Sequence, residues 1–144
     1  MNKEQTLTGV IRGTGACVPE RILDNKEIAG FVDTSDEWIR ERTGVRRRRI
    51  AEKETTVSMA CEAGRQAVEE AGILPGEIDM ILVATGSPDQ IFPCTACQVQ
   101  EALGADGAVG FDLNAACSGF LFCLQYGTGI HHIRNLSYGA GNRK

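Results

Sequence analysis

The stretch FDLNAACSGFLFC, Phe111 to Cys123, runs from a short apolar segment through small residues to Cys117 and on into further apolar residues. This order predicts a strand that turns directly into a helix, with the cysteine at the turn. Small neighbours let the turn tighten and let a substrate reach the sulfur, while a helix N-terminus stabilises a thiolate. The pattern indicates a nucleophile at Cys117 that can accept an acyl group. A small buried core cysteine is the alternative that this pattern leaves open.

Strands and helices alternate through the rest of the chain. Residues 79–85 (DMILVAT) form a short, continuous apolar run, which is typical of a strand covered on both faces of a parallel sheet. The alternation predicts an α/β layered fold with a largely parallel sheet, in which ligands bind beyond the carboxyl ends of the strands. The other expected strands cover residues 8–16 and 108–113, and the expected helices cover residues 24–30, 34–42, 55–71 and 93–103.

Length and composition indicate one globular domain over residues 1–144. The chain has 42% hydrophobic residues and a net charge of −4, which argues against disorder and against general affinity for nucleic acid. It contains neither a signal peptide nor a long apolar run, so we expect no membrane span and a cytoplasmic location. In that compartment the six cysteines are expected to stay reduced.

Cys94 and Cys97 form a C-x-x-C pair in the sequence FPCTACQ. A four-ligand zinc site needs further ligands, but no second cysteine pair has this spacing and His131 and His132 are adjacent. We therefore predict no metal site and interpret the two cysteines as small residues that open a helix. A metal or dithiol redox module remains the alternative.

The run Arg46 to Arg49 places four consecutive arginines in a chain that is acidic overall. Four such side chains cannot all be buried, so the run is a local basic patch. It is either a solvated strand edge or loop, or a landing site for a phosphate or an acidic partner.

Three motifs occur together: DTSDEWIRERTGVRRRRI (Asp33 to Ile50), ILVATGSPDQIFPCTACQVQ (Ile81 to Gln100) and FDLNAACSGF (Phe111 to Phe120). Over roughly residues 8–128 they resemble the N-terminal half of the β-ketoacyl-acyl carrier protein synthase III family. The resemblance implies the N-terminal half of a thiolase-like layered fold, with a mostly parallel sheet flanked by helices. It also implies an initiating condensing enzyme of type II fatty-acid synthesis.

The resemblance also implies roles for individual residues. Cys117 matches the family's cysteine that accepts an acyl group, usually acetyl, from coenzyme A before condensation with malonyl-acyl carrier protein. Trp38 matches a tryptophan on which the adenine of coenzyme A stacks, Arg42 an arginine beside the phosphates, and Thr34 a neighbouring hydrogen-bonding position. Phe92 matches an aromatic that reaches across a homodimer interface into the partner's acyl pocket, although a core position also fits its spacing. No cofactor is implied besides the coenzyme A thioester, which is a substrate.

The final segment, GTGIHHIRNLSYGAGNRK, departs from the family. Read one base later from Gly129, with permitted codons, the same bases encode AYIISGTYRTALVIG, which reads as a helix end, a turn and a buried strand. We therefore expect a frameshift near Gly129, an aberrant tail over residues 129–144, and a truncated chain. The histidine and asparagine that activate the malonyl unit in the family come from its second half, and His131 and His132 do not replace them.

Two other interpretations remain open. The chain is a non-catalytic remnant or dimerisation piece that pairs through the segment around Phe92, or it derives from a related thiolase-like synthase of secondary metabolism. The length and branching of the acyl primer are not encoded in these residues, because much of the acyl pocket comes from the second half and from the partner subunit.

Overall fold

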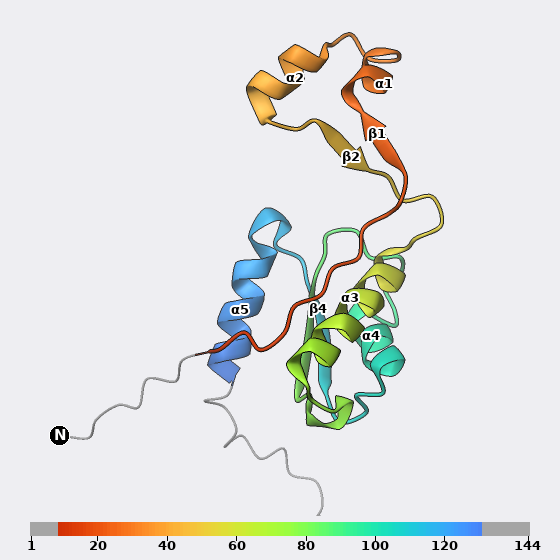
Figure 1. The fold of residues 1–144 in the computed structure, drawn as a ribbon. Coiled ribbons are helices and arrows are strands. Elements are labelled where there is room, and N and C mark those ends of the chain that lie inside the picture. The colour runs from red at the N-terminus through yellow and green to blue at the C-terminus, as the bar shows by residue number, and fades with distance from the viewer. Residues whose placement is uncertain (1–8, 131–144) are drawn as a thin grey trace, which may run out of the picture.

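The apolar runs expected to be strands form the centre of the structure (Figure 1). The computed structural model describes residues 9–130. Strand β3 (Met80–Ala84) pairs in parallel with β4 (Val109–Leu113), with Met80 opposite Val109 and Ala84 opposite Leu113. Helices α3 and α4 lie on one side of this pair and α5 on the other (Figure 1). This arrangement confirms the predicted α/β class.

Helix α3 (Thr56–Ala71) begins and ends at the residues that the sequence predicts. The Thr55 hydroxyl accepts a hydrogen bond from the Ser58 amide, and Gly72 ends the helix in a left-handed conformation with φ of 63°. The carboxylate of Asp89, from the segment that follows β3, accepts hydrogen bonds from the amides of Thr56 and Val57. These bonds satisfy amides that a helix leaves unpaired at its start and tie α3 to the sheet.

Helix α4 (Thr95–Leu103) packs on β4 through small residues. Thr95 and Ala96 are fully buried, and a side chain at Gly110 would meet Ala96 at 3.3–3.4 Å. A short 3₁₀ helix, η1 (Pro75–Glu77), precedes β3. The buried hydrophobic residues of the described chain are mostly alanines and lie in or near α4, with Ile39 the exception: Ala96, Val99, Ala105, Ala108 and Ile39.

A smaller unit carries the first two helices and an antiparallel strand pair (Figure 1). It contains β1 (Ile22–Asp24), α1 (Asn25–Ala29), α2 (Asp36–Thr43) and β2 (Arg47–Arg49). The buried Asn25 amide group donates to the Asp36 carboxylate and to the Val45 carbonyl, and its oxygen accepts from Arg48. One buried side chain therefore connects α1, α2 and β2.

Residues 9–16 correct the prediction of a strand. In the described part of the chain they take no place in either sheet and instead follow α3, where the Thr14 amide and hydroxyl donate to Glu70 and the Ala16 amide donates to Gln66. Gly13 and Gly15 lie so close to the α3 backbone that a Cβ at either position would collide with helix carbonyls. The glycines that weaken a strand here permit a close approach to a helix.

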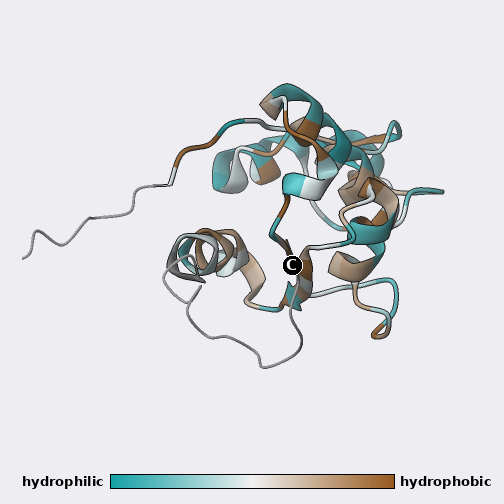
Figure 2. Cartoon of the chain, turned by 90° about the horizontal axis from the view of Figure 1, so that it is seen from below, coloured by the Kyte–Doolittle hydropathy of each residue, from teal (hydrophilic) through white to brown (hydrophobic). Residues whose placement is uncertain are grey.

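Helix α5 (Gly119–Ile130) exposes apolar side chains along its length. Phe120 and Leu121 are 65% and 67% exposed, and Phe122, Leu124 and Tyr126 are also exposed. Figure 2 shows hydrophobic colour along this helix. A helix that is apolar around most of its circumference is typical of a buried element.

Within residues 9–130, no helix is long and apolar enough to cross a membrane. The predicted frameshift concerns a segment that lies almost entirely outside the described residues.

We expect the purified chain to bind an environment-sensitive hydrophobic dye strongly and to self-associate, because contiguous exposed apolar surface promotes both. Dye fluorescence and light scattering measure the two effects. Leu121→Gln together with Leu124→Gln should reduce both signals, whereas Lys53→Gln, at an exposed position away from α5, serves as the control. A monodisperse wild-type chain without dye binding would contradict this prediction.

Candidate active site

Cys117 lies between a strand and a helix, as the sequence predicts. Strand β4 ends at Leu113, a 3₁₀ turn η2 (Ala116–Ser118) follows, and α5 begins at Gly119. The thiol of Cys117 is exposed, so the alternative of a core cysteine does not hold in this chain. Figure 1 places the start of α5 at the carboxyl end of the parallel strands, on the side that faces the α1–α2 unit. This edge is where ligands bind in open α/β sheets.

The backbone immediately before Cys117 is strained. Ala116 has φ of 44°, and it is the only residue other than glycine with positive φ in residues 9–130. This conformation costs roughly 1–2 kcal/mol for a residue with a Cβ, and such strain concentrates at functional sites. The strained turn directs the chain sharply from strand to helix and leaves the sulfur of Cys117 in solvent, as in a nucleophile elbow.

Two local contacts hold the turn in place. The Ser118 amide and hydroxyl both donate to the Ala115 carbonyl, at 3.1 and 2.8 Å. Gly119 lies so close to the end of β3 that an added Cβ would stand 2.8 Å from the Cβ of Ala84. A larger side chain at residue 119 must therefore push α5 away from the sheet. The turn that carries Cys117 would move together with α5.

The other cysteines differ from Cys117 in their surroundings. Burial raises the pKa of the Cys61 and Cys123 thiols, so a smaller fraction of each is thiolate near neutral pH. Both lie inside helices, on α3 and α5, and not at a turn from strand to helix. The structure thus separates one solvent-exposed cysteine at a strand-to-helix turn from thiols that favour the protonated form.

Trp38 and Arg42 lie one turn apart on α2. Ser35 caps the start of this helix, and its hydroxyl accepts a hydrogen bond from the Trp38 amide. The indole is 53% exposed, and the Arg42 guanidinium stands over it, 4.9 Å from the ring centroid. The Thr34 hydroxyl is buried and has no hydrogen-bond partner within the described residues. The structure brings Trp38 and Arg42 together and leaves a polar atom at Thr34 available for a further partner.

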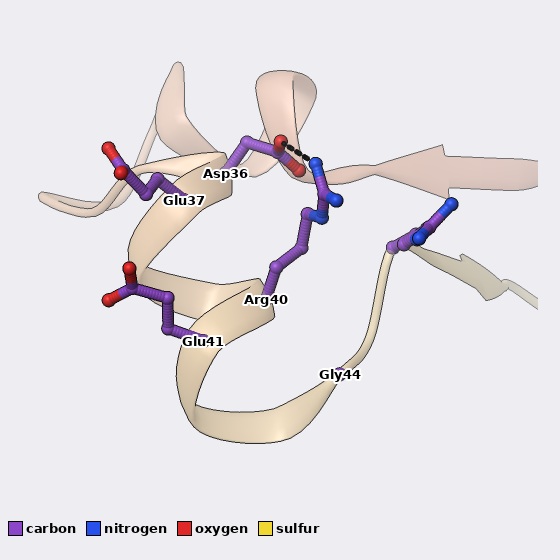
Figure 3. A pocket seen from close by; sticks show the side chains of 6 residues that line it. Asp36, Glu37, Arg40, Glu41 and Gly44 are labelled. Atoms are coloured by element: carbon purple, nitrogen blue, oxygen red, sulfur yellow. Dashed lines mark hydrogen bonds and ion pairs between the residues drawn. The ribbon is translucent and has the colours of Figure 1, made fainter.

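A separate open hollow lies along another face of α2 (Figure 3). It has a volume of about 550 Å³ and its lining is polar: Asp36, Glu37, Arg40, Glu41, Gly44 and Arg46. Figure 3 shows Arg40 reaching toward Asp36 while Glu37 and Glu41 extend to the other side. The hydrogen bond from Asn25, opposed by partial burial and reinforced by Arg40, holds the pKa of Asp36 below its usual value. Because neither Trp38 nor Arg42 lines this hollow, it does not coincide with the predicted coenzyme A site.

Phe92 lies in the segment between β3 and α4 and is 90% exposed, next to Ile91 at 91%. A core position, the alternative from the sequence, is therefore wrong for this chain. Two adjacent large apolar side chains that are almost fully exposed are typical of an interface rather than of a free surface.

The arginine run is partly structural. Arg48 donates to Asn25, and Arg49 donates to the carbonyls of Pro19 and Glu20. Three of the four arginines form β2, in which Arg47 and Arg49 are exposed and Arg48 is half-buried. Arg46 lines the hollow of Figure 3 instead. Sequence reasoning missed the buried Asn25 beneath this strand, since a single asparagine carries no pattern that predicts burial.

A parallel strand pair with helices on both faces, and an exposed cysteine where a strand turns into a helix, defines a layered α/β fold with a nucleophile elbow. No family model matches the chain. It is 52% identical over 119 residues to β-ketoacyl-[acyl-carrier-protein] synthase III of Erythrobacter litoralis. The alignment covers 82% of this chain and 37% of that protein. It is 53% identical over 115 residues to the synthase III of Clostridium acetobutylicum, with 80% and 35% covered.

Solved structures agree. The 3-oxoacyl-[acyl-carrier-protein] synthase III of Aquifex aeolicus superposes with a TM-score of 0.82 at 46% identity, over 85% of this chain and 40% of that one. The priming β-ketosynthase of the R1128 polyketide pathway superposes with a TM-score of 0.80 at 42% identity, over 83% of this chain and 36% of that one. The chain therefore belongs to the β-ketoacyl-[acyl-carrier-protein] synthase III family, and it spans a little over a third of the length of these relatives.

We expect Gly119→Ala to destabilise the chain by about 1–3 kcal/mol, because the new methyl group collides with Ala84. Gly127→Ala on the same helix is the matched control: its added methyl group meets nothing within 4 Å, and it should stabilise the chain by up to about 1 kcal/mol. Urea unfolding followed by circular dichroism measures both changes. Ala84→Gly should restore part of the loss in the Gly119→Ala background. Equal stability of the two single variants would show that this contact does not position the turn.

Proposed function

We propose that this chain contributes the acyl-accepting cysteine of an initiating condensing enzyme of type II fatty-acid synthesis. The observation that carries the proposal is the exposed Cys117 at the strained turn between β4 and α5. An accessible sulfur at a helix start suits nucleophilic attack on a thioester. The similarity to β-ketoacyl-[acyl-carrier-protein] synthases over four-fifths of the chain supports the same reaction.

In the first step the Cys117 thiolate attacks the carbonyl carbon of an acyl-coenzyme A, with acetyl as the expected acyl group. The C–S bond to coenzyme A breaks, coenzyme A leaves as a thiol after taking up a proton, and the acyl group remains on Cys117 as a thioester. In the second step malonyl-acyl carrier protein loses carbon dioxide, and its carbanion attacks this thioester to form a C–C bond and release Cys117.

The two steps make different demands on the protein. Acyl capture requires chiefly the thiolate and donors for the oxyanion, whereas decarboxylative condensation also requires groups that stabilise the carbanion equivalent. Residues 9–130 contain no histidine. We therefore assign the first step to the residues of this chain and the second step to a complete enzyme of the family.

Binding of the nucleotide part of coenzyme A is assigned to α2 and to Thr34, two residues before its start. The exposed indole face of Trp38 offers adenine a stacking surface, and the guanidinium of Arg42 can pair with a phosphate by charge-assisted hydrogen bonds. The buried, unpartnered hydroxyl of Thr34 offers a hydrogen bond beside them. No other cofactor is needed, because the thioester is itself the activated substrate.

Partners follow from the same proposal. In the complete enzyme, Phe92 crosses a homodimer interface toward the partner's acyl pocket, which gives its exposed ring a place to be buried. The acidic carrier protein meets exposed arginines of the run from Arg46, and the enzyme works in the cytoplasm. The similarity to the R1128 priming ketosynthase keeps a synthase of secondary metabolism as the alternative assignment.

Acyl capture can be tested by intact mass. After incubation with acetyl-coenzyme A we expect the mass of one acetyl group per chain, removable by neutral hydroxylamine because the bond is a thioester. Cys117→Ser should lose this mass, whereas Cys123→Ser, six residues along the same helix, should keep it. An acetyl group that persists in Cys117→Ser, or none in the wild type, would remove the acyltransferase assignment from this chain.

The coenzyme A handle can be tested by fluorescence, since Trp38 is the only tryptophan. Coenzyme A should quench the indole on stacking. Arg42→Ala should raise Kd by roughly three- to tenfold through the loss of a charged contact. Arg40→Ala, which removes an exposed ion pair with Asp36 on another face of the same helix, should leave Kd nearly unchanged. Equal effects of the two variants would contradict this placement.

A second candidate function is a non-catalytic piece that binds a synthase subunit. The near-complete exposure of Ile91 and Phe92 favours it. The acetylation experiment distinguishes the two candidates, because a binding piece needs no reactive Cys117. Co-elution with a full-length synthase that is lost in Phe92→Ala, combined with no acetylation, is the result that would favour this candidate.

A further inference from the structure

Cys94 and Cys97 bring two sulfur atoms into contact at the start of α4. Cys94 is the residue that precedes the helix, and its sulfur lies within hydrogen-bond distance of the sulfur of Cys97, 3.3 Å away. Cys97 lies in the first turn, where its sulfur also stands 4.0 Å from the Gly110 carbonyl of β4. Both side chains are partly exposed. The sequence pattern left two interpretations open, small residues that open a helix and a dithiol redox module. The contact between the two sulfurs favours the dithiol.

The backbone that carries the two sulfurs is held from both sides. The carboxylate of Asp112 on β4 accepts hydrogen bonds from the amides of Thr95 and Ala96, at 2.9 and 2.8 Å, and both residues are fully buried. The Gln98 side chain donates to the Pro93 carbonyl, so the residue before Cys94 is tied to the same turn. The sulfurs are therefore held in proximity by the fold rather than by their spacing in the sequence alone.

We propose that Cys94 and Cys97 form a reversible dithiol–disulfide site that exchanges with small-molecule disulfides such as glutathione disulfide. The proposal is independent of acyl transfer at Cys117. It is argued as a redox pair rather than a metal site, because residues 9–130 contain no cluster of three or more histidine, cysteine, aspartate or glutamate side chains placed to hold a metal ion.

Cys94 is the attacking residue. Its thiolate attacks one sulfur of glutathione disulfide, an S–S bond forms to Cys94, and one glutathione leaves as a thiolate that takes up a proton. Cys97, as its thiolate, then attacks the Cys94 sulfur, closes the internal disulfide and releases the second glutathione. The protein loses two protons and two electrons, and glutathione disulfide gains them to become two thiols.

The surroundings of Cys97 fit the second role. The hydrogen bond with Cys94, together with burial and the negative charges of Cys94 and Asp112, raises the pKa of the Cys97 thiol. A thiol that stays protonated reacts slowly with an external disulfide, but its position against Cys94 makes the internal step effectively unimolecular. Oxidation would link the first turn of α4 to the end of the segment that presents Ile91 and Phe92.

The test is a redox titration of the full chain in glutathione buffers, followed by trapping with N-ethylmaleimide. Cleavage after Asp89 and Glu101 releases residues 90–101, which contain no cysteine other than Cys94 and Cys97. We expect this peptide to lose two hydrogens and to escape alkylation in oxidising buffer, and to carry two labels after reduction. The same titration in guanidinium chloride supplies the unfolded reference, in which roughly tenfold more oxidising buffer should be needed for half-conversion.

Variants test the order of attack. Cys97→Ser should stop at a mixed disulfide between Cys94 and glutathione, whereas Cys94→Ser should react several-fold more slowly than Cys97→Ser. Cys61→Ser, on α3, should leave the titration of the peptide unchanged. The proposal is overturned if the wild-type peptide stays doubly labelled in oxidising buffer, stops at the mixed disulfide, or converts at the same buffer ratio folded and unfolded. Because the measured peptide, residues 90–101, does not contain Cys117, failure of acetylation at Cys117 does not affect this result.

Discussion

The hydrogen bonds from the amides of Thr95 and Ala96 to the carboxylate of Asp112 are the contacts on which the layered unit depends. Cys94, the residue before the helix, supplies no side-chain cap of its own, so a strand provides the cap instead. A side-chain cap is worth about 1–2 kcal/mol, and here it also fixes the position of α4 on the sheet. The buried residues of α4 pack only if this attachment holds.

The same strand positions the candidate nucleophile. Side chains alternate along a strand, so Gly110 and Asp112 face α4 while Phe111 and Leu113 point toward the side of α5. The strand continues into the Ala116 turn, whose strain of roughly 1–2 kcal/mol must be offset by its surroundings. The two hydrogen bonds from Ser118 to Ala115 and the close packing of Gly119 on Ala84 supply that support.

Elements with a clear period or a clear end could be predicted from the sequence. The spacing of apolar residues located α3, which Gly72 ends in a left-handed conformation, and the continuous apolar run located β3. Strand β1 was missed because three residues carry no usable period. The segment at residues 9–16 was mispredicted because its β-branched residues resemble a strand, whereas its glycines serve contact with a helix.

In the candidate site, too, only residues whose role follows from local sequence order could be predicted. Cys117 could be located from the order of apolar run, small residues and helix, since that order dictates local geometry. Asn25 and Asp112 could not, because their partners lie 11 to 23 and 16 to 17 residues away and only the fold reveals them. Trp38 and Arg42 came from the resemblance, and the stacking of the guanidinium on the indole is a structural finding that four-residue spacing on a helix makes possible.

The proposed acyl transfer requires that one of the six cysteines of the chain be selected over the others. Thiolate is the reactive form, so a thiol with a raised pKa competes poorly at neutral pH. Burial raises the pKa of Cys61 and Cys123, and the contact with Cys94 does so for Cys97. Cys117 differs from these three in being exposed to solvent, in the turn that follows β4. Under the proposed function, selectivity for Cys117 over Cys61, Cys97 and Cys123 arises as much from the raised pKa of those three thiols as from the turn that presents Cys117.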